Sequence, residues 1–191
     1  MEVVSSFFDF FVFRWKHIAL LNLLFFGCVF VSALVGQFLF GAKFYYELPL
    51  EQELPYEDLT VIAWDIFVCK LFISAFLVIT LPGIIFFPLS VGFLLYRGVL
   101  WGFSLYSFPK SAFFLILPAL VIEGEAYVLA ALAGWVLGFS WVKPPYFFDK
   151  RLSRWMSFEK AFMESVRIYV LVFLFLLVGA SVEALTIPYV I

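Results

Sequence analysis

The stretch "LPALVIEGEAYVLAALAGWVLG" (residues 117–138) decides how this chain folds. It is long and apolar enough to cross a bilayer as a helix, which takes about 20 apolar residues. It also carries two carboxylates, Glu123 and Glu125. A charged group within the hydrocarbon is costly, so it is usually paired or belongs to a functional site. These carboxylates therefore either hold the fold together through partners or mark a site.

The composition of the whole chain indicates a membrane protein. Of its 191 residues, 65% are hydrophobic and only 14% are charged, and the mean hydropathy is +1.10. A soluble domain of this size cannot bury so much apolar surface, so lipid must surround most of it. We expect one multi-pass domain over residues 1–191 in the cell membrane. The formal net charge of −2 gives no reason to expect a nucleic-acid partner.

Hydropathy predicts an all-α bundle of about five transmembrane helices. The expected spans cover residues 18–41, 61–81, 84–108, 111–141 and 166–190. Two short proline-containing pairs fall between spans, Pro82 with Gly83 and Pro109 with Lys110. We expect turns there because proline and glycine commonly interrupt helices and favour turns. The first turn would join spans two and three as an antiparallel hairpin.

The charge of the segments between spans predicts the orientation. Basic residues lie before the first span and before the last one: Arg14, Lys16, Lys143, Lys150, Arg151, Arg154 and Lys160. The segment after the first span is acidic, with Glu47, Glu51, Glu53, Glu57 and Asp58. Lys and Arg favour the cytoplasmic side. Five spans then place the N-terminus inside and the C-terminus outside.

The basic segment before the last span has a pattern of its own. Over residues 150–165, apolar side chains recur at mostly helical spacing with basic ones among them. That pattern is typical of a helix lying on a membrane surface, so we expect an interfacial helix there. The alternative is a simple lead-in to the last span, and the two are compatible.

Small residues predict where helices approach each other closely, because they let backbones come near in lipid. The third span has a G-x-x-x-G at Gly98 and Gly102. The fourth span has a small residue at every fourth position: Ala126, Ala130, Gly134 and Gly138. We expect spans three, four and five to pack as a tight inner group. The G-x-x-x-G could instead serve dimerisation.

Counting about 1.5 Å of rise per residue places the charged side chains by depth. Arg97 and Glu123 come out near the midplane, Lys70 somewhat above it on span two, and Glu183 in the outer half of span five. Asp65 falls at the outer headgroups. Ionisable groups at such depth usually face the protein interior and pair with one another.

Two interpretations of these charges remain open. In the first, Arg97 and Glu123 form a buried ion pair, and Glu125 is hydrogen-bonded or protonated elsewhere. In the second, Arg97, Glu123 and Glu183 line a hydrated polar site with Lys70 nearby. Glu125 lies about 200° round a regular helix from Glu123, so it points elsewhere unless the helix breaks. The count of carboxylates against cations leaves two carboxylates unpaired, which must be protonated, hydrated or neutralised by a cation.

Three stretches resemble one family. "LPALVIEGEAYVLAALAGWVLG", "LYRGVLWG" and "ASVEALTIPYVI" resemble, in order, motifs of stage II sporulation protein M-like membrane proteins over roughly residues 60–190. Carried across, the resemblance marks Glu123, Glu183, Gly98, Gly102, Ala126, Ala130 and Gly134 as family positions. Arg97 departs from it, because the family commonly has Asn there, and Ala119 with Leu120 replaces a frequent His-Gly pair. Glu125 matches no family position.

The resemblance implies a membrane fold more than an activity. In spore-formers it implies a scaffold that holds peptidoglycan-degrading enzymes during engulfment. The sequence itself has no H-E-x-x-H, G-x-S-x-G, Walker A or C-x-x-C motif, and His17 is its single histidine. We therefore expect no enzyme, no catalytic residue, no metal site and no cofactor.

Two functions remain open. The first is a non-catalytic scaffold or accessory subunit, whose buried charges specify helix packing. Its partners would be other membrane proteins or a second copy of the chain. The second is a small transporter or channel for a cation, a proton or a small solute, in which Glu123 and Glu183 act as ligands or proton carriers.

Overall fold

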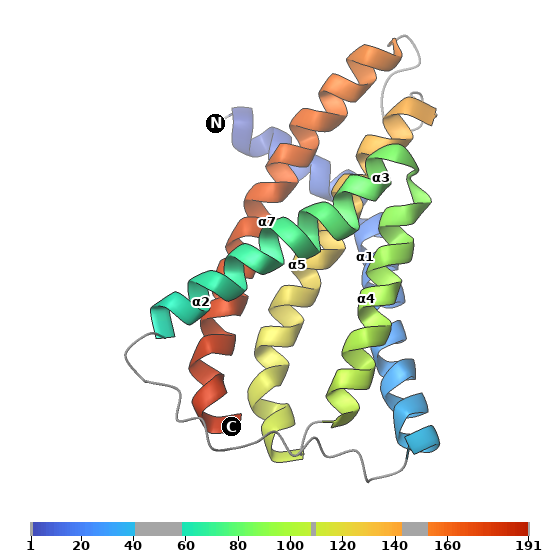
Figure 1. The fold of residues 1–191 in the computed structure, drawn as a ribbon. Helices are drawn as coiled ribbons and strands as arrows, with labels where there is room; N and C mark the ends of the chain where they lie inside the picture. Colours follow the sequence, from blue (N-terminus) through green and yellow to red (C-terminus); the bar gives the residue numbers. More distant parts are fainter. Residues whose placement is uncertain (1, 41–58, 108–109, 143–152, 191) are drawn as a thin grey trace.

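A computed structural model describes residues 2–40, 59–107, 110–142 and 153–190, which form a helical bundle without strands (Figure 1). Five stretches are long and apolar enough to cross a membrane: Arg14–Leu39, Leu59–Ile85, Pro88–Leu105, Phe114–Val142 and Arg154–Thr186. The predicted all-α bundle of five membrane-capable helices is confirmed. The side on which each terminus lies stays a prediction, and the acidic segment after the first span lies outside the described residues.

Four long helices and one composite helix make up the bundle. The long helices are α1 (Glu2–Phe40), α4 (Pro88–Ser107), α5 (Lys110–Val142) and α7 (Arg154–Val190). The composite joins α2 (Leu59–Val68), the π-helix η3 (Cys69–Thr80) and α3 (Leu81–Ile85). We call α2, η3 and α3 together the crossing helix, because it runs obliquely over α7 and α5 towards α4 (Figure 1).

The stretch at residues 117–138 forms most of α5, the central helix of the bundle. Its middle is buried on every side, through Ala126, Tyr127, Val128, Leu129, Ala130, Ala131, Leu132 and Ala133. A helix that is apolar all round has to be surrounded by protein or lipid, and here α1, α4, α7, η3 and α3 surround it. The helix is continuous through Pro118 and Gly124.

The small residues of α5 meet the end of the crossing helix. A Cβ atom added to Gly138 would lie 2.1 Å from the carbonyl oxygen of Gly83, and one on Gly134 would lie 3.0 Å from that of Thr80. The two backbones are thus in contact. Thr80 Oγ1 donates a hydrogen bond to the carbonyl of Ala130 at 2.8 Å. This bond holds the crossing helix against α5 beside Ala130.

The predicted turn at Pro82 and Gly83 is wrong. The helix continues to Ile85, and the chain turns at Phe86, whose backbone is extended with φ −146° and ψ 108°. Pro82 lies in the first turn of α3, where its missing N–H is tolerated. Gly83 serves close packing, because a Cβ there would lie 2.9 Å from the backbone of Gly134. The boundary between spans two and three therefore lies a turn later than predicted.

The middle of the crossing helix is wound more loosely than an α-helix. Its buried residues are Ser74, Ala75, Ile79 and Thr80, so the pattern of burial recurs every five residues. A π-helix pairs residues five apart and brings these four onto one face. Tyr169 of α7 secures that face, since its hydroxyl lies 2.6 Å from Thr80 Oγ1 and donates to the carbonyl of Ala75 at 3.2 Å.

The G-x-x-x-G of α4 packs against α1, so the expected inner group of spans three, four and five is wrong for α4. A Cβ on Gly102 would lie 2.1 Å from Ser32 Oγ and 2.4 Å from the carbonyl oxygen of Val29, while one on Gly98 would lie 3.2 Å from that of Phe25. A stripe of small residues reveals a close approach but not which helix makes it. Both glycines are covered within the chain, which leaves no room for dimerisation through them.

Residues 154–165 belong to the same helix as the last span. The helix α7 is continuous from Arg154 to Val190, which fits the lead-in alternative, and the expected position of its first turns on the membrane surface stays a prediction. Ser157, Ala161 and Ser165 are buried along it, and Ser165 Oγ donates to the carbonyl of Ala133 on α5 at 3.3 Å. This polar but buried face ties the segment to α5. Residues 150–152 lie outside the described residues.

Two glycines of α4 allow a matched test of this packing. We expect Gly102→Ala to destabilise the protein by about 1–3 kcal/mol, because the added methyl overpacks the contact with α1. Gly92→Ala is the control, since a Cβ at Gly92 has nothing within 4 Å, and alanine in a helix is then favourable by up to about 1 kcal/mol. Unfolding in mixed detergent micelles measures both. Equal stability of the two variants would contradict the packing of α4 on α1.

Candidate functional site

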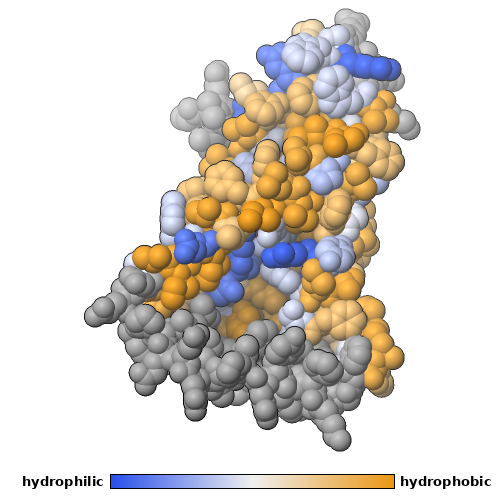
Figure 2. Space-filling view, in the orientation of Figure 1, coloured by the Kyte–Doolittle hydropathy of each residue, from blue (hydrophilic) through white to orange (hydrophobic). Residues whose placement is uncertain are grey.

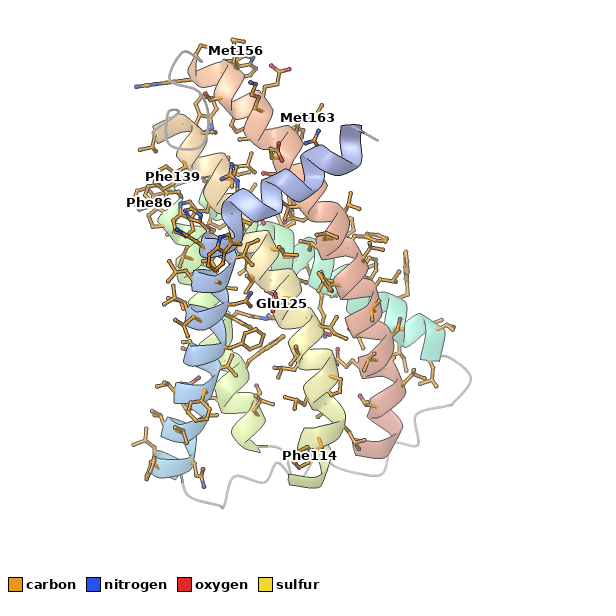
Figure 3. All side chains as sticks on the ribbon, turned by 180° about the vertical axis from the view of Figure 1, so that it is seen from behind. Phe86, Phe114, Glu125, Phe139, Met156 and Met163 are labelled. Carbon is orange, nitrogen blue, oxygen red and sulfur yellow. The ribbon has the colours of Figure 1, made fainter. Side chains whose placement is uncertain are left out.

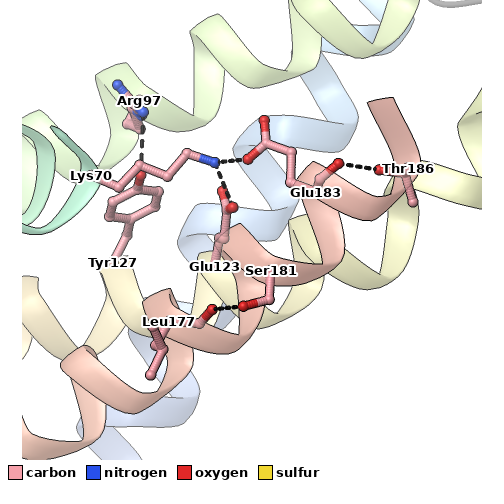
Figure 4. Close-up of polar contacts among 8 residues, drawn as sticks. All are labelled: Lys70, Arg97, Glu123, Tyr127, Leu177, Ser181, Glu183 and Thr186. Carbon is pink, nitrogen blue, oxygen red and sulfur yellow. Dashed lines mark hydrogen bonds and ion pairs between the residues drawn. The ribbon is translucent and has the colours of Figure 1, made fainter. Parts of the chain in front are cut away.

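One lysine joins carboxylates from two other helices. Lys70 Nζ on η3 lies 2.5 Å from Glu123 Oε1 on α5, and it also donates to Glu183 Oε2 on α7 (Figure 4). The side chains come from elements far apart in sequence, which the oblique path of the crossing helix brings together. We call Lys70, Glu123, Glu183, Arg97 and Tyr127 the charge cluster.

The cluster leads from the interior of the bundle to its surface. The side chain of Glu123 is 4% exposed, that of Lys70 is 15% exposed and that of Glu183 is 37% exposed. Figure 2 shows hydrophilic side chains gathered across the middle of one face, beside a hollow. The inner carboxylate is therefore enclosed, and the outer one is accessible from outside the protein.

A glycine on α7 makes room for the buried carboxylate. A Cβ added to Gly179 would lie 2.6 Å from Cγ of Glu123, so any other residue at this position would push the side chain away. Gly179 lies about one turn before Glu183 on the same helix. Consequently α7 both accommodates Glu123 and supplies the second carboxylate for Lys70.

Arg97 bonds to a tyrosine, so the predicted Arg97–Glu123 pair is wrong. Its guanidinium lies 5.1 Å from the ring centre of Tyr127, and Nη2 donates to the tyrosine hydroxyl at 3.3 Å. The counter-ion of Glu123 is Lys70. The prediction failed because depth was counted for upright helices, whereas the crossing helix is oblique and carries Lys70 to the level of Glu123.

The charges of the cluster balance. Lys70 and Arg97 are formally cationic, and Glu123 and Glu183 are formally anionic, so the sum is zero. The count of charges in the sequence left two carboxylates without a cation. The two carboxylates that lie outside the charge cluster are Asp65 and Glu125. Asp65 is exposed on α2, and Glu125 accepts a hydrogen bond from Asn22 Nδ2 of α1 at 3.1 Å. A balanced set of charges needs no further ion to be tolerated inside the bundle.

Sequence reasoning missed two residues of this region, Tyr127 and Asn22. Tyr127 follows Glu123 by four residues, so it shares its helical face, and that spacing could have revealed it. Asn22 is an amide within a span that is otherwise almost wholly apolar, "IALLNLLFFG". Within the described ranges, no three His, Cys, Asp or Glu side chains gather in a way that could hold a metal ion.

A comparison with known families places most of the chain in one family. A family model described as "Stage II sporulation protein M" matches residues 18–188. The chain belongs to the stage II sporulation protein M family. The match covers every residue of the charge cluster, and it extends the predicted resemblance back into the first span. No curated protein and no solved structure matches the chain.

In this member of the stage II sporulation protein M family, two positions that the motifs single out meet on one side chain. Glu123 and Glu183 belong to separate motifs, and both bond to Lys70. The lysine belongs to none of the three motifs that were recognised in the sequence. Its position beside both carboxylates became evident only from the path of the crossing helix.

Lys70 is expected to be the residue on which the cluster depends most. Its replacement in Lys70→Met leaves Glu123 buried without a cation, which should cost about 3–5 kcal/mol of unfolding free energy. The double variant Lys70→Met with Glu123→Gln should recover part of this loss, because the uncompensated charge is gone. Reversible unfolding in mixed micelles measures all three proteins.

Arg97→Met serves as the comparison for that experiment. It removes one hydrogen bond and one cation–π contact to Tyr127, and each such contact is worth about 1–2 kcal/mol or less. A loss for Arg97→Met that equals the loss for Lys70→Met would show that Arg97 is the counter-ion of Glu123 after all.

Proposed function

We propose that this protein is a non-catalytic scaffold or accessory subunit of a multi-pass assembly in the cell membrane. One observation carries the proposal, namely that Lys70 bonds to both Glu123 and Glu183. Lys70, Glu123 and Glu183 are therefore paired with each other and hold η3, α5 and α7 in one arrangement. Charges used in this way specify helix packing.

The rest of the bundle is consistent with a rigid body that presents a surface to neighbours. Backbone contacts fix α4 on α1 and the crossing helix on α5. Large apolar side chains cover the outside, including Phe72 and Phe76 on η3, and Val170 and Phe173 on α7. Lipid or the helices of other membrane proteins can pack on this surface. The family resemblance also implies a scaffold role, and we propose no reaction for this chain.

A second candidate function rests on the graded exposure of the cluster. Exposure rises from Glu123 through Lys70 to Glu183, and a hollow adjoins the hydrophilic side chains on this face (Figure 2). A transporter or channel for a cation, a proton or a small solute would use such a polar path. In it, Glu123 and Glu183 would exchange Lys70 for the transported species.

The variant Glu123→Gln separates the two functions. Under the scaffold proposal, it lowers the melting temperature in detergent, because it replaces an ion pair with Lys70 by a weaker contact. Proton and potassium flux into liposomes that contain the protein should equal the leak of empty liposomes, for the wild type and for the variant. A pH-sensitive and a potassium-sensitive dye inside the vesicles measure the flux.

Asp65→Asn provides the control. Asp65 is a carboxylate on the exposed face of α2, so its neutralisation should change neither melting temperature nor flux. A wild-type flux above the leak that Glu123→Gln abolishes and Asp65→Asn preserves would overturn the scaffold proposal in favour of transport.

A further inference from the structure

The last helix, α7, packs on the bundle through one face and leaves the opposite face exposed. The packed face carries small and aliphatic side chains, namely Ser157, Ala161, Ser165, Ile168, Val172 and Leu176. On the opposite face, Met156, Met163 and Val170 are each at least 50% exposed, and Figure 3 labels the two methionines near the start of the helix. They recur every seven residues, which is almost two helical turns. We call these three residues the methionine row.

The first turns of α7 lie outside the hydrocarbon of the membrane. The helix has 37 residues and is therefore about 55 Å long, whereas the hydrocarbon is about 30 Å thick. Even at a tilt of about 40°, the upper end of the usual range, such a helix extends over about 42 Å of depth. Five charged side chains lie in residues 154–167, but only Glu183 lies in residues 168–190. The excess length is therefore at the start of the helix, with Met156 and Met163.

Lipid tails therefore leave the first part of the methionine row uncovered. Met156 and Met163 are apolar but lie at the level of the headgroups or of the water beyond them, where apolar side chains exposed together indicate a protein contact. Deeper in the membrane, Val170 lines a groove of about 500 Å³ between α7 and η3, together with Phe72 and Phe76. The row thus belongs to an apolar surface that begins outside the hydrocarbon and continues into it.

Two opposite charges flank the methionine row. Glu159 and Lys160 are both exposed, and among the described residues neither takes part in an ion pair. Successive residues of a helix lie about 100° apart and differ in height by about 1.5 Å, so the carboxylate and the ammonium lie on either side of the row at nearly one depth. The surface therefore fits a partner that presents a cation and an anion at that depth in the reverse order.

A second copy of the chain has these properties. Two copies in one membrane have the same orientation, so a two-fold axis that relates them runs along the membrane normal, and the same surface of each copy forms the interface. Each α7 then meets the other α7 in parallel and at the same depth. The two-fold rotation places the flank that carries Glu159 opposite the flank that carries Lys160. Two identical ion pairs can therefore form, one on each side of the row.

We propose that two copies of this protein form a dimer through the exposed face of α7. Met156, Met163 and Val170 of the two copies pack together in the seam, as apolar side chains with seven-residue spacing do in paired helices. Glu159 of each copy bonds to Lys160 of the other. The interface uses no residue of the charge cluster, so the dimer is independent of whether the protein acts as a scaffold or as a transporter.

Exchange of the two charges gives a matched test in liposomes. Glu159→Lys and Lys160→Glu each replace both ion pairs of the dimer with contacts between like charges, and we expect each to weaken dimerisation about tenfold. The double variant, Glu159→Lys with Lys160→Glu, should regain the wild-type dimer, because the same two pairs form again with their signs exchanged. Energy transfer between donor-labelled and acceptor-labelled copies of the whole protein, as it is diluted with lipid, measures the fraction of dimer.

Oxidative cross-linking locates the interface. In a background of Cys28→Ser and Cys69→Ser, which removes both native cysteines, we expect Met163→Cys to give a disulfide-linked dimer. Ile85→Cys is the control, because Ile85 is 83% exposed on α3 but lies outside the proposed interface. It should stay monomeric under the same oxidation.

Three results would overturn the dimer. They are monomeric protein at every dilution, a double charge variant that dimerises as weakly as the single variants, and a cross-link through Ile85→Cys but not through Met163→Cys. Monomeric protein would mean that lipid covers the exposed face of α7. The charge variants should all stay folded, because both side chains are exposed, and circular dichroism checks this.

Discussion

The pairing of Lys70 with Glu123 is the contact on which the arrangement of this bundle depends. A carboxylate that is almost fully enclosed in a membrane protein requires a cation nearby, and the helix that brings its ion-pair partner Lys70 is the oblique crossing helix. The position of η3 over α5 is therefore set by an electrostatic requirement. The second bond of the lysine, to Glu183, brings α7 into the same arrangement.

Close backbone contacts make that arrangement attainable. Gly83, Gly134 and Gly138 let the crossing helix lie against α5, and Gly179 leaves space for the Glu123 side chain. The π-helical winding of η3 keeps the residues that face α5 and α7 on one side between Lys70 and Thr80. Glycine and loose winding thus act together, because each brings polar groups of different helices within bonding distance.

The sequence predicted the elements of the fold better than their pairing. Hydropathy located five membrane-capable helices, and three short motifs indicated the family. The partner of Gly98 and Gly102 was not predictable, because a glycine stripe fits any helix that comes near. The partner of Glu123 was missed for a related reason, since a count of residues gives depth in an upright helix but not the tilt that brings Lys70 there.

The positions of the charged residues along the chain also bear on how the protein is made. The partners of Lys70 follow it by 53 and 113 residues, so both are synthesised after the lysine. Helices of membrane proteins insert first and associate afterwards. The crossing helix must therefore enter the bilayer, or wait beside it, with an uncompensated ammonium until α5 and α7 arrive. Its final oblique position is thus reached only after α7, which carries Glu183, has been synthesised.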